Sequence, residues 1–429
     1  MNRVILKAQG KNKNKSVIYI SNESISDGEP DLNLSEHILY NRYICLFFLS
    51  KGGFSSVWVV YDIVDFDLKS AKIFHDSPDE FYNEKQVFEH ITPHKNIVKC
   101  YDIFEENSLM VIITELLGIS LLEIINDIYD QRYTLFMPNI KFMYKQILCG
   151  FSELHNLGII HADIKPDNIL LDILPRNIIT LGNMIKDLNL PEYYNTIFNT
   201  LVPPEYESFN KNKKKMAKRK IKIKTIKKIR DYIFEKIDVI TLKENKIINT
   251  EYIDYNHNLL LEHQFKLKII DFSNSEFDNK ISQNEIYIRP YRSLENILNI
   301  NYNSKCEIWA IGCLFYELVT GIPMFKTKSG VSENEKNIDH LFNIIKTFKN
   351  ENYKEIVENS DFYDNFFINK NLKIKNRYEV PDLRQKLRYN SIIEIGSEET
   401  YLYLSLFFIF NVNLRPDCKI LMEHHFLKW

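Results

Sequence analysis

Several features that would narrow the class of this chain are scarce or missing. Glycine accounts for only 12 of the 429 residues, so any pair of neighbouring glycines stands out. The six cysteines are scattered without a C-x-x-C pair, which favours free thiols in a reducing compartment over a disulfide framework. The net charge of −2 provides no whole-molecule field for nucleic acid or an anionic membrane.

Long apolar segments are also missing. The longest apolar run, Tyr401–Phe410, is too short to span a bilayer, and we expect it to form a buried helix. Residues 1–15 are polar and basic, with no secretory apolar core. We therefore expect a cytoplasmic protein, or one that also enters the nucleus, without membrane association. The composition, 45% hydrophobic and 26% charged, is globular, and the length suffices for two lobes.

The segment His161–Asn168 reads H-A-D-I-K-P-D-N and lies between two apolar stretches. It places a carboxylate (Asp163), an ammonium (Lys165) and an amide (Asn168) close together. Phosphoryl transfer needs such a set: a carboxylate accepts the proton of the attacking hydroxyl, a cation meets the charge of the transferred group, and an amide oxygen binds a hard metal ion. The alternative is a polar loop that matches by chance.

Two further charged residues occur earlier in the chain. Lys72 lies in a short strand-like run, where a lysine is usually a solvated edge residue. Ser77 and Pro78 signal a helix start, and Glu84 then lies on the apolar stripe of the predicted helix. Because an inward carboxylate is costly unless paired, we expect Lys72 to be its partner. The alternative is a glutamate at the edge of an ordinary amphipathic face.

A second carboxylate and a glycine pair complete the set of candidates. Asp271 ends an apolar strand-like run, which suits a Mg²⁺ ion bound together with substrate phosphates. The glycine pair lies between two strand-like runs, where backbone N–H groups can approach phosphates closely. The alternative is an ordinary hairpin turn. The predicted phosphate loop consists of Leu49, Ser50, Lys51, Gly52, Gly53, Phe54, Ser55, Ser56 and Val57.

Taken in order, these motifs resemble those of eukaryotic protein kinases, and the resemblance covers about residues 41–429. Four features are similar to the SR-protein kinase branch of the CMGC group: the segment Tyr291–Glu295 with R-S-L-E, the F-S-x-V-W pattern of Phe54–Trp58, Ala162 in place of the arginine of H-R-D, and a long insertion before Asp271. The resemblance implies an α+β, bilobal protein kinase fold that uses ATP and Mg²⁺. It also implies transfer to serine or threonine hydroxyls, with arginine/serine-rich proteins as the candidate substrates, by a monomer.

The resemblance assigns a role to each candidate. Asp163 is the expected base, and Lys165 contacts the transferred group. Asn168 and Asp271 are the expected metal ligands. The remaining roles belong to nucleotide binding and to structure: Lys72, fixed by Glu84, holds the α/β-phosphates, the connector Thr114–Leu117 with Glu115 and Leu117 meets the adenine, and Glu295 pairs with Arg415. Glu333, Glu335 and Asp339 are candidates for docking a basic peptide, although a charged helix start explains them equally well.

The same plan divides the chain. It predicts an N-terminal extension at 1–40, a β-rich N-lobe at 41–117 and a helical C-lobe at 118–429, interrupted by a basic insertion at about 172–264. Ile140–Leu154 and Ile308–Leu318 are predicted helices. The insertion is densest in lysine at 210–230, with isoleucines interleaved. We expect a solvated, partly disordered loop there, with a localisation signal or a site for an anionic partner as alternatives. Nucleic-acid binding is not expected elsewhere.

Several positions depart from the kinase pattern, namely Ser50, Ser273, Ile288 and Glu307. Each can lower the rate, but none removes a group that performs chemistry. Ala162 cannot receive an activation-loop phosphate, so we predict activity without that phosphorylation. Two alternatives stay open: a pseudokinase that binds partners without turnover, and a kinase of small molecules or lipids. All four chemical residues are present, which argues against the first, and the Arg292–Glu295 pattern argues against the second.

Overall fold

The computed structural model describes residues 16–17, 32–129, 136–238, 265–278, 287–300, 303–326, 332–349, 353–358, 360, 363–369, 371–373, 378–390 and 398–428. Across these residues, no helix combines the length and the apolar character needed to cross a membrane. The chain divides into two compact units. Unit 1 comprises residues 1–81, 99–118 and 173–254, and unit 2 comprises residues 82–98, 119–172 and 255–429.

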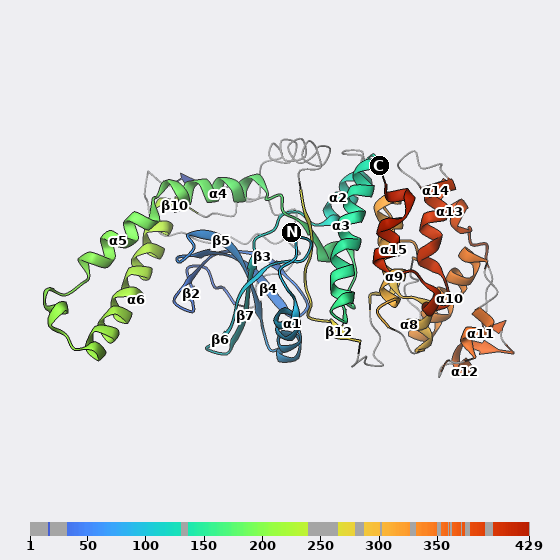
Figure 1. Cartoon of the computed structure of the whole chain (residues 1–429), viewed down its shortest axis with the longest axis horizontal. Coiled ribbons are helices and arrows are strands. Elements are labelled where there is room, and N and C mark those ends of the chain that lie inside the picture. Colours follow the sequence, from blue (N-terminus) through green and yellow to red (C-terminus); the bar gives the residue numbers. More distant parts are fainter. Residues whose placement is uncertain are drawn as a thin grey trace. The chain divides into compact units, whose positions relative to one another are not determined.

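Unit 1 is built on a six-stranded sheet in the order β2-β3-β4-β5-β7-β6, in which all neighbours are antiparallel (Figure 1). Successive side chains of β3 and β4 alternate between the two faces of the sheet, and both faces are covered. One face carries Ile44 and Tyr61, and the other carries Tyr43 and Trp58. The strands are β2 (Ile38–Leu39), β3 (Tyr43–Lys51), β4 (Ser55–Asp62), β5 (Asp67–Phe74), β6 (Cys100–Glu106) and β7 (Leu109–Glu115).

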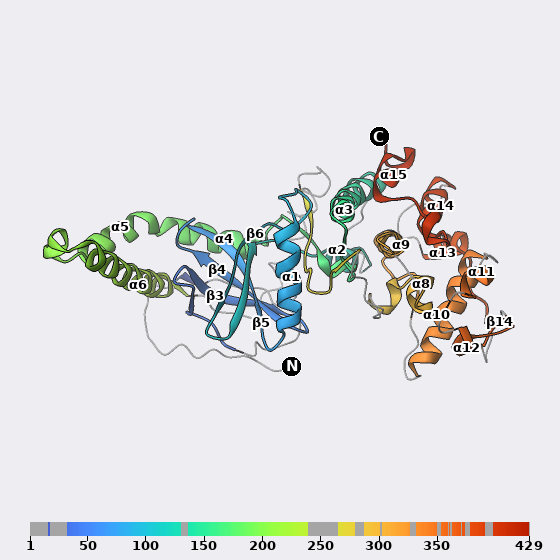
Figure 2. The same ribbon diagram turned by 60° about the horizontal axis from the view of Figure 1, so that its bottom comes forward.

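The described part of the insertion forms helices that belong to unit 1: α4 (Arg176–Asp187), α5 (Leu190–Thr200), the 3-10 turn η2 (Pro204–Ser208) and α6 (Lys211–Lys236). Figures 1 and 2 show α5 and α6 as an antiparallel hairpin extending from the sheet. The expectation of a solvated, partly disordered loop was therefore wrong for residues 210–230. The short strand β10 (Ile237–Asp238) follows and pairs with β1 (Ser16–Val17).

Burial of isoleucines explains why the insertion folds. Ile178, Leu181 and Ile185 recur at helical spacing along α4, and they share one apolar cluster with Ile44 and Tyr61 of the sheet. Each fully buried isoleucine or leucine contributes roughly 1.5–3 kcal/mol. Three isoleucines of α6, Ile226, Ile229 and Ile233, are members of the same cluster.

Unit 2 is mainly helical. Its central helix, α9 (Cys306–Thr320), is buried at every position, and both predicted helices are confirmed. Helix α3 (Met137–Asn156) leads toward His161–Asn168, which we call the catalytic segment after its predicted role. The boundary between the units falls within α1 (Pro78–His90), after Phe81. The other helices are α2 (Leu121–Tyr129), α8 (Leu294–Leu298), α10 (Glu333–Phe348), α11 (Tyr353–Val357), α12 (Tyr363–Phe366), α13 (Leu383–Asn390), α14 (Glu398–Ser405) and α15 (Cys418–Glu423).

Short strands and 3-10 turns connect these helices. The antiparallel pairs β9–β11 and β8–β12 hold the two ends of the catalytic segment. The run Tyr401–Phe410 is only partly the helix we predicted, because α14 ends at Ser405 and a 3-10 turn follows. The elements are β8 (Ile159–Ile160), η1 (Pro166–Asn168), β9 (Ile169–Leu171), β11 (Leu267–Ile269), β12 (Glu276–Phe277), η3 (Arg289–Tyr291), β13 (Phe367–Ile368), β14 (Asn371–Leu372), η4 (Leu406–Phe408), η5 (Val412–Leu414) and η6 (His425–Leu427).

Candidate active site

In unit 1, the predicted phosphate loop is the turn between β3 and β4. Its register pairs Ser50 with Val57 and Lys51 with Ser56, and the N–H of Gly52 donates to the carbonyl of Ser55 at 2.7 Å. No protein atom of the described residues lies within 4 Å of the place where a Gly53 side chain would begin. Packing within the described part of the protein therefore does not require glycine at position 53, and the role of the glycine pair in binding phosphate stays a prediction.

The base of this loop is fixed by side chains. The Ser56 hydroxyl accepts from Trp58 Nε1 at 3.2 Å and is bonded to His75 Nε2 at 2.8 Å. The backbone N–H of His75 donates to the carbonyl of Phe54 at 3.3 Å. Lys72 lies opposite Val57 in the register of β4 and β5, on the same face of the sheet. This register therefore places Lys72 on β5, the strand next to the one that leaves the loop.

The connector follows β7, which ends at Glu115. The carboxylate of Glu115 accepts from the backbone N–H of Lys99 at 2.7 Å, so its side chain serves the end of the sheet. Leu49 of the loop and Leu116 of the connector both pack against the cluster that includes α4. The insertion thus shares an apolar core with two segments predicted to meet the nucleotide. Leu117 lies beside them in the chain and is partly exposed.

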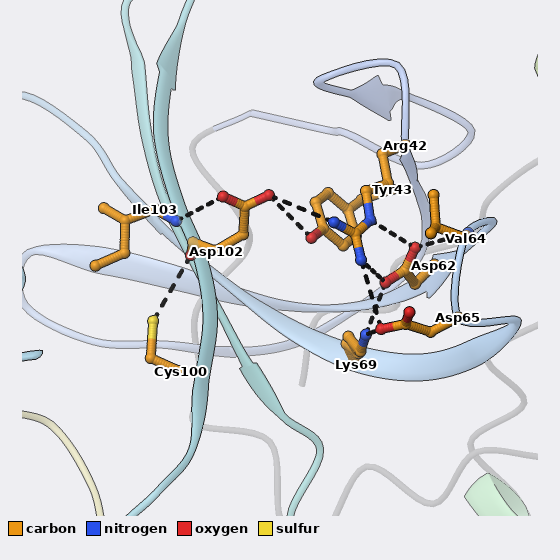
Figure 3. Close-up of polar contacts among 9 residues, drawn as sticks. All are labelled: Arg42, Tyr43, Asp62, Val64, Asp65, Lys69, Cys100, Asp102 and Ile103. Carbon is orange, nitrogen blue, oxygen red and sulfur yellow. Dashed lines mark hydrogen bonds and ion pairs between the residues drawn. The ribbon is translucent and has the colours of Figure 1, made fainter. Parts of the chain in front are cut away.

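Unit 1 also contains a charged cluster that we did not predict. The Asp62 cluster comprises Arg42, Tyr43, Asp62, Asp65, Lys69 and Asp102 (Figure 3). The carboxylate of Asp62, with 0% exposure, accepts from Arg42 at 2.7 and 2.8 Å and from Lys69 at 2.7 Å. It lies at the end of β4 opposite the glycine turn. The sequence signals that could have indicated this cluster were Asp62, at the end of one apolar run, and Lys69, near the start of the next.

Electrostatics keeps this carboxylate charged. Burial alone would raise the pKa of Asp62, but the hydrogen bonds from Arg42 and Lys69 outweigh it and hold that pKa below its ordinary value. The pKa of Arg42 is raised, chiefly by its hydrogen bond to Asp62. The cluster joins β3, β4, β5 and β6, because Asp102 of β6 accepts from the hydroxyl of Tyr43 at 3.1 Å.

In unit 2, the catalytic segment brings its three predicted residues together. The Oδ2 atom of Asp163 accepts from Lys165 Nζ at 2.7 Å and from Asn168 Nδ2 at 2.9 Å. Asn168 Nδ2 also donates to the backbone carbonyl of Asp163 at 2.8 Å. Since the amide nitrogen is used in this way, the amide oxygen of Asn168 is the atom that can ligate a metal. The 3-10 turn Pro166–Asn168 produces this close approach.

The same segment is also held by the buried pair of Glu307 and His155. Ala162 has a left-handed backbone with φ of 64°, and its N–H donates to Glu307 at 3.0 Å. The same carboxylate, with 0% exposure, accepts from the Tyr287 hydroxyl at 3.0 Å and bonds His155 Nε2 at 2.9 Å. Glu307 therefore performs a structural task at the position where the kinase pattern has aspartate.

The charge state of this pair follows from its surroundings. Burial disfavours both charges, but His155 and the N–H of Ala162 hold the pKa of Glu307 below its ordinary value. Burial likewise disfavours the imidazolium, but Cys418 and Glu307 raise the pKa of His155. An ionised Glu307 and a protonated His155 thus face each other under the catalytic segment.

The second metal candidate lies next to the first. The backbone N–H of Ile270 donates to the carbonyl of Asn168 at 3.0 Å, which brings Asp271 to the adjacent strand end. Asp271 has a left-handed backbone with φ of 63°. Ser273, which replaces the glycine of the kinase pattern, donates from its hydroxyl to Asp271 Oδ1 at 2.6 Å and from its N–H at 3.3 Å. Ser273, although it departs from the kinase pattern, therefore holds the predicted metal ligand Asp271 in place.

Helix α1 contacts the same segment. Glu84, only 2% exposed, accepts from the N–H of Phe272 at 3.2 Å, and Asn83 donates to the carbonyls of Ser273 and Ser275 at 2.8 and 2.7 Å. The fully buried ring of Phe272 meets those of Phe88 and His161, each with centroids 5.4 Å apart. The prediction of an inward Glu84 is confirmed. Its pairing with Lys72 would join the two units and stays a prediction.

Two other predictions concern α8 and α10. Arg415, fully buried, donates to Glu295 at 2.7 and 3.2 Å, so the predicted pair is confirmed. The three candidate docking acids are engaged within unit 2. Glu333 pairs with Arg289 and with Lys336, Glu335 completes a capping box with Ser332, and Asp339 accepts from Tyr378 at 2.8 Å. Each of the three acids thus has a partner within unit 2, and their role in docking a basic peptide stays a prediction.

The donor set fits a hard divalent metal. Asn168 and Asp271 present oxygen atoms from neighbouring strand ends, and Mg²⁺ prefers a few oxygen ligands of this kind together with phosphates. Among the residues that the structure describes, no group of three or more histidines, cysteines, aspartates and glutamates could bind a metal by itself. A metal here would thus need further oxygen ligands, from water or from bound phosphate groups.

The profile of the protein kinase domain family matches this chain in two segments, residues 49–184 and 175–427. The chain belongs to the protein kinase domain family. The division between the two matched segments falls within the predicted insertion. A crystal structure of a kinase domain superposes with a TM-score of 0.61, covering 92% of this chain and 97% of that one at 19% identity. The predicted kinase fold, with its β-rich and helical parts, is confirmed.

Curated relatives support a protein kinase that acts as a phosphotransferase. This kinase is 25% identical to a putative serine/threonine-protein kinase of Acanthamoeba polyphaga mimivirus, over 72% of each chain. It is 25% identical to the serine/threonine-protein kinase SRPK of Physarum polycephalum, over 68% of this chain and 63% of the relative. It is 23% identical to the dual specificity kinase lkh1 of Schizosaccharomyces pombe, of which it spans 32%. The SRPK relative agrees with the predicted resemblance.

Proposed function

We propose that this kinase transfers the γ-phosphoryl group of ATP to serine or threonine hydroxyls of basic, arginine/serine-rich proteins. The observation that carries the proposal is the geometry at Asp163, whose Oδ2 atom accepts from both Lys165 and Asn168. That arrangement fixes the carboxylate and leaves its Oδ1 atom to accept the proton of the substrate hydroxyl. Lys165 then lies close enough to meet the charge of the transferred group.

Magnesium is the metal we propose for Asn168 and Asp271, because hard oxygen ligands suit it. When bound, it would neutralise phosphate charge during transfer. The chain's own contribution is position: the Ser273 hydroxyl holds Asp271, and the amide group of Asn168 is held by Asp163. Lys72 is the proposed partner of the α/β-phosphates, and the loop of Gly52 and Gly53 is proposed to cover them with backbone N–H groups.

The substrate class depends on the SRPK relative and on the R-S-L-E segment. The acids of α10 add no support, since they have partners in unit 2. A monomer in the cytoplasm or nucleus is proposed as well, and the six free thiols are consistent with a reducing compartment. Size-exclusion chromatography with light scattering tests the monomer.

The experiment compares two peptides, one arginine/serine-rich and one acidic, with purified protein, ATP and Mg²⁺. We expect transfer to the basic peptide, and a loss of about 10²–10⁴-fold in Asp163→Asn, which removes the base while keeping the shape of the side chain. Preference for the acidic peptide would end the substrate assignment. ATP binding without transfer to either peptide would show a non-catalytic binding protein instead.

A further inference from the structure

Helix α6 carries a dense and one-signed charge. Between Lys211 and Arg230 there are ten lysines and two arginines, and no aspartate or glutamate. We call this set the basic helix surface. Ten of its members are exposed, and Lys214 and Arg230 are half-buried. The members are Lys211, Lys213, Lys214, Lys215, Lys218, Arg219, Lys220, Lys222, Lys224, Lys227, Lys228 and Arg230.

The surface belongs to an ordered element. Asn210 caps α6 by accepting from the N–H of Lys213 at 2.9 Å, and the ammonium of Lys213 lies 3.8 Å from the centre of the Phe209 ring. At the other end, Ile229 and Ile233 are buried in the cluster shared with the sheet. The charges are therefore displayed at fixed positions along about 30 Å, at 1.5 Å per residue.

The first half of α6 differs from the second. From Lys211 to Lys220 no residue is buried, so basic side chains point outward around the helix. From Ile221 onward, one side of α6 is buried and contributes to the apolar cluster shared with the sheet, and the lysines lie on the exposed side. Figures 1 and 2 show this first half at the free end of the α5–α6 hairpin, away from the sheet of unit 1.

Most of these charges have no internal counter-charge. Lys214 pairs with Glu207 at 2.7 Å, and Arg230 pairs with Asp231 at 2.5 Å. The other ten have no ion pair with any residue that the structure describes. Ten uncompensated cations repel one another at a cost that a purely structural helix would avoid. The buried isoleucines stabilise the folded helix, whereas the charges do not.

We propose that the basic helix surface binds the phosphate backbone of nucleic acid. A nucleic-acid strand presents about one phosphate every 3.4 Å in a duplex, so several phosphates can lie along a basic surface about 30 Å long. Lysine meets phosphates as a point charge without fixed geometry, so binding should be independent of sequence. This role is separate from the proposed phosphoryl transfer and does not depend on it.

Two other anionic partners fit less well. Insertion of a helix into a membrane surface uses an exposed apolar face, but Ile226, Ile229 and Ile233 are already buried in the apolar cluster of unit 1. A groove that binds an acidic protein helix would need apolar contacts beside the charges. Met216 is the one large apolar side chain exposed among the residues of α6 that the structure describes. Pure charge complementarity over a long, straight surface favours nucleic acid.

The experiment measures binding of the full chain to a fluorescent 20-nucleotide polyuridine by anisotropy between 50 and 200 mM NaCl. The variant replaces five exposed cations with glutamine: Lys218, Arg219, Lys220, Lys222 and Lys224. We expect at least an order-of-magnitude loss of affinity at 100 mM NaCl. If all five contact phosphates, the slope of log K against log salt becomes shallower by about 3.5, at roughly 0.7 per contact for a single strand.

A matched control replaces five exposed lysines outside α6 with glutamine: Lys95, Lys266, Lys326, Lys419 and Lys428. It should bind within about twofold of the unmodified chain. Glutamine has nearly the helix propensity of lysine, so α6 should persist, and circular dichroism checks this. Crosslinking followed by mass spectrometry of the unmodified chain should place the RNA on α6 peptides, which tests the surface without any substitution.

Three results would overturn the proposal. The first is that the α6 variant with five substitutions binds RNA with the same affinity as the unmodified chain. Polyglutamate of equal charge could compete as strongly as RNA, which would indicate an acidic protein partner. Vesicles containing phosphatidylserine could bind α6 while RNA does not, which would indicate a membrane. Failure of kinase activity would leave all three measurements intact.

Discussion

Each unit contains a carboxylate with no exposed surface, and the two are neutralised differently. Asp62 of unit 1 is held by Arg42 and Lys69, which are permanent cations near neutral pH. Glu307 of unit 2 is held by the titratable His155, by one backbone N–H and by a tyrosine hydroxyl. The Asp62 cluster joins strand ends at the opposite end of β4 from the turn at Gly52 and Gly53, whereas Glu307 contacts the residue before Asp163, the proposed base. Similar burial thus serves stability in one unit and position in the other.

The largest effect is expected at Asp62. Asp62→Asn leaves Arg42 and Lys69 without their buried counter-charge, and breaking such a pair costs about 3–5 kcal/mol. Chemical denaturation measures the free energy of unfolding, and kcat should stay within about twofold at temperatures where the variant is folded. Asp65→Asn is the control, since its carboxylate is 46% exposed and should cost at most about 1 kcal/mol. An equal loss in both variants would contradict a special role for burial.

At Glu307 the effect should appear in the rate. Glu307→Gln removes the charge that faces His155 and weakens the hold on the N–H of Ala162, so Asp163 loses its fixed position. A misplacement of this kind lowers kcat by about 10–100-fold with little change in KM for ATP. Glu307→Asp keeps the charge and should recover most of the rate. If Glu307→Gln loses only stability, the contrast with Asp62 fails.

The two carboxylates also predict different pH dependence. The folded-state pKa of His155 is raised to about 10, so its contribution is complete below its unfolded value of about 6.5 and is lost as the pH rises through 10. The stability difference between the unmodified chain and His155→Gln should therefore shrink between pH 7 and 10. The difference for Asp62→Asn should not, because the pKa values of Arg42 and Lys69 are both raised.

At acid pH the two regions should behave alike. The pKa values of Asp62 and Glu307 are both lowered on folding. Their contributions are present above the unfolded values of about 3.9 and 4.3 and are lost as the pH falls toward the folded ones. Melting temperatures from pH 6 to pH 3 check this. A steep loss near pH 6 would contradict it.

The comparison also shows where sequence reasoning succeeds. The segment His161–Asn168 was predictable because its chemistry lies within eight consecutive residues. Glu84 was predictable because it breaks an otherwise apolar stripe, whereas Glu295 was predicted from the resemblance alone. The Asp62 cluster was missed since its members come from four strands and the turns beside them, and they have no common spacing. The insertion was read by its lysines alone, although Ile178, Leu181 and Ile185 had the spacing of a helix. One-signed charge and helical burial are compatible when the two occupy different sides.

A smaller effect is expected at Ser273, which holds the proposed metal ligand Asp271. Ser273→Ala and Ser273→Gly both remove the hydroxyl that donates to Asp271 at 2.6 Å. The loss of about 1 kcal/mol for one such bond predicts a roughly fivefold rise in the Mg²⁺ concentration for half-maximal activity, equal in both variants. A rise in the glycine variant alone would show that backbone freedom matters instead of the hydroxyl.

The smallest effect, none at all, is expected from removing phosphate between Asp271 and Glu295. The side chain of Ala162 is a buried methyl group and cannot receive a phosphate. Each described hydroxyl of this segment has an internal partner: Ser273 with Asp271, Ser275 with His161, Tyr287 with Glu307, Tyr291 with Glu317, and Ser293 with Asn296. Ser282 is the remaining hydroxyl, and it lies outside the described residues.

Phosphorylation of any of the five bonded hydroxyls would replace a donated proton with two negative charges beside a carboxylate, a carbonyl or an amide oxygen, so it should disrupt the segment and not order it. Treatment with a phosphatase should leave the initial rate within about twofold, and Ser282→Ala should do the same. Mass spectrometry of the active enzyme provides the independent check. An obligatory phosphate on Ser282 would mean that a cation other than the one replaced by Ala162 receives it, and that Glu307 alone does not set the position of Asp163.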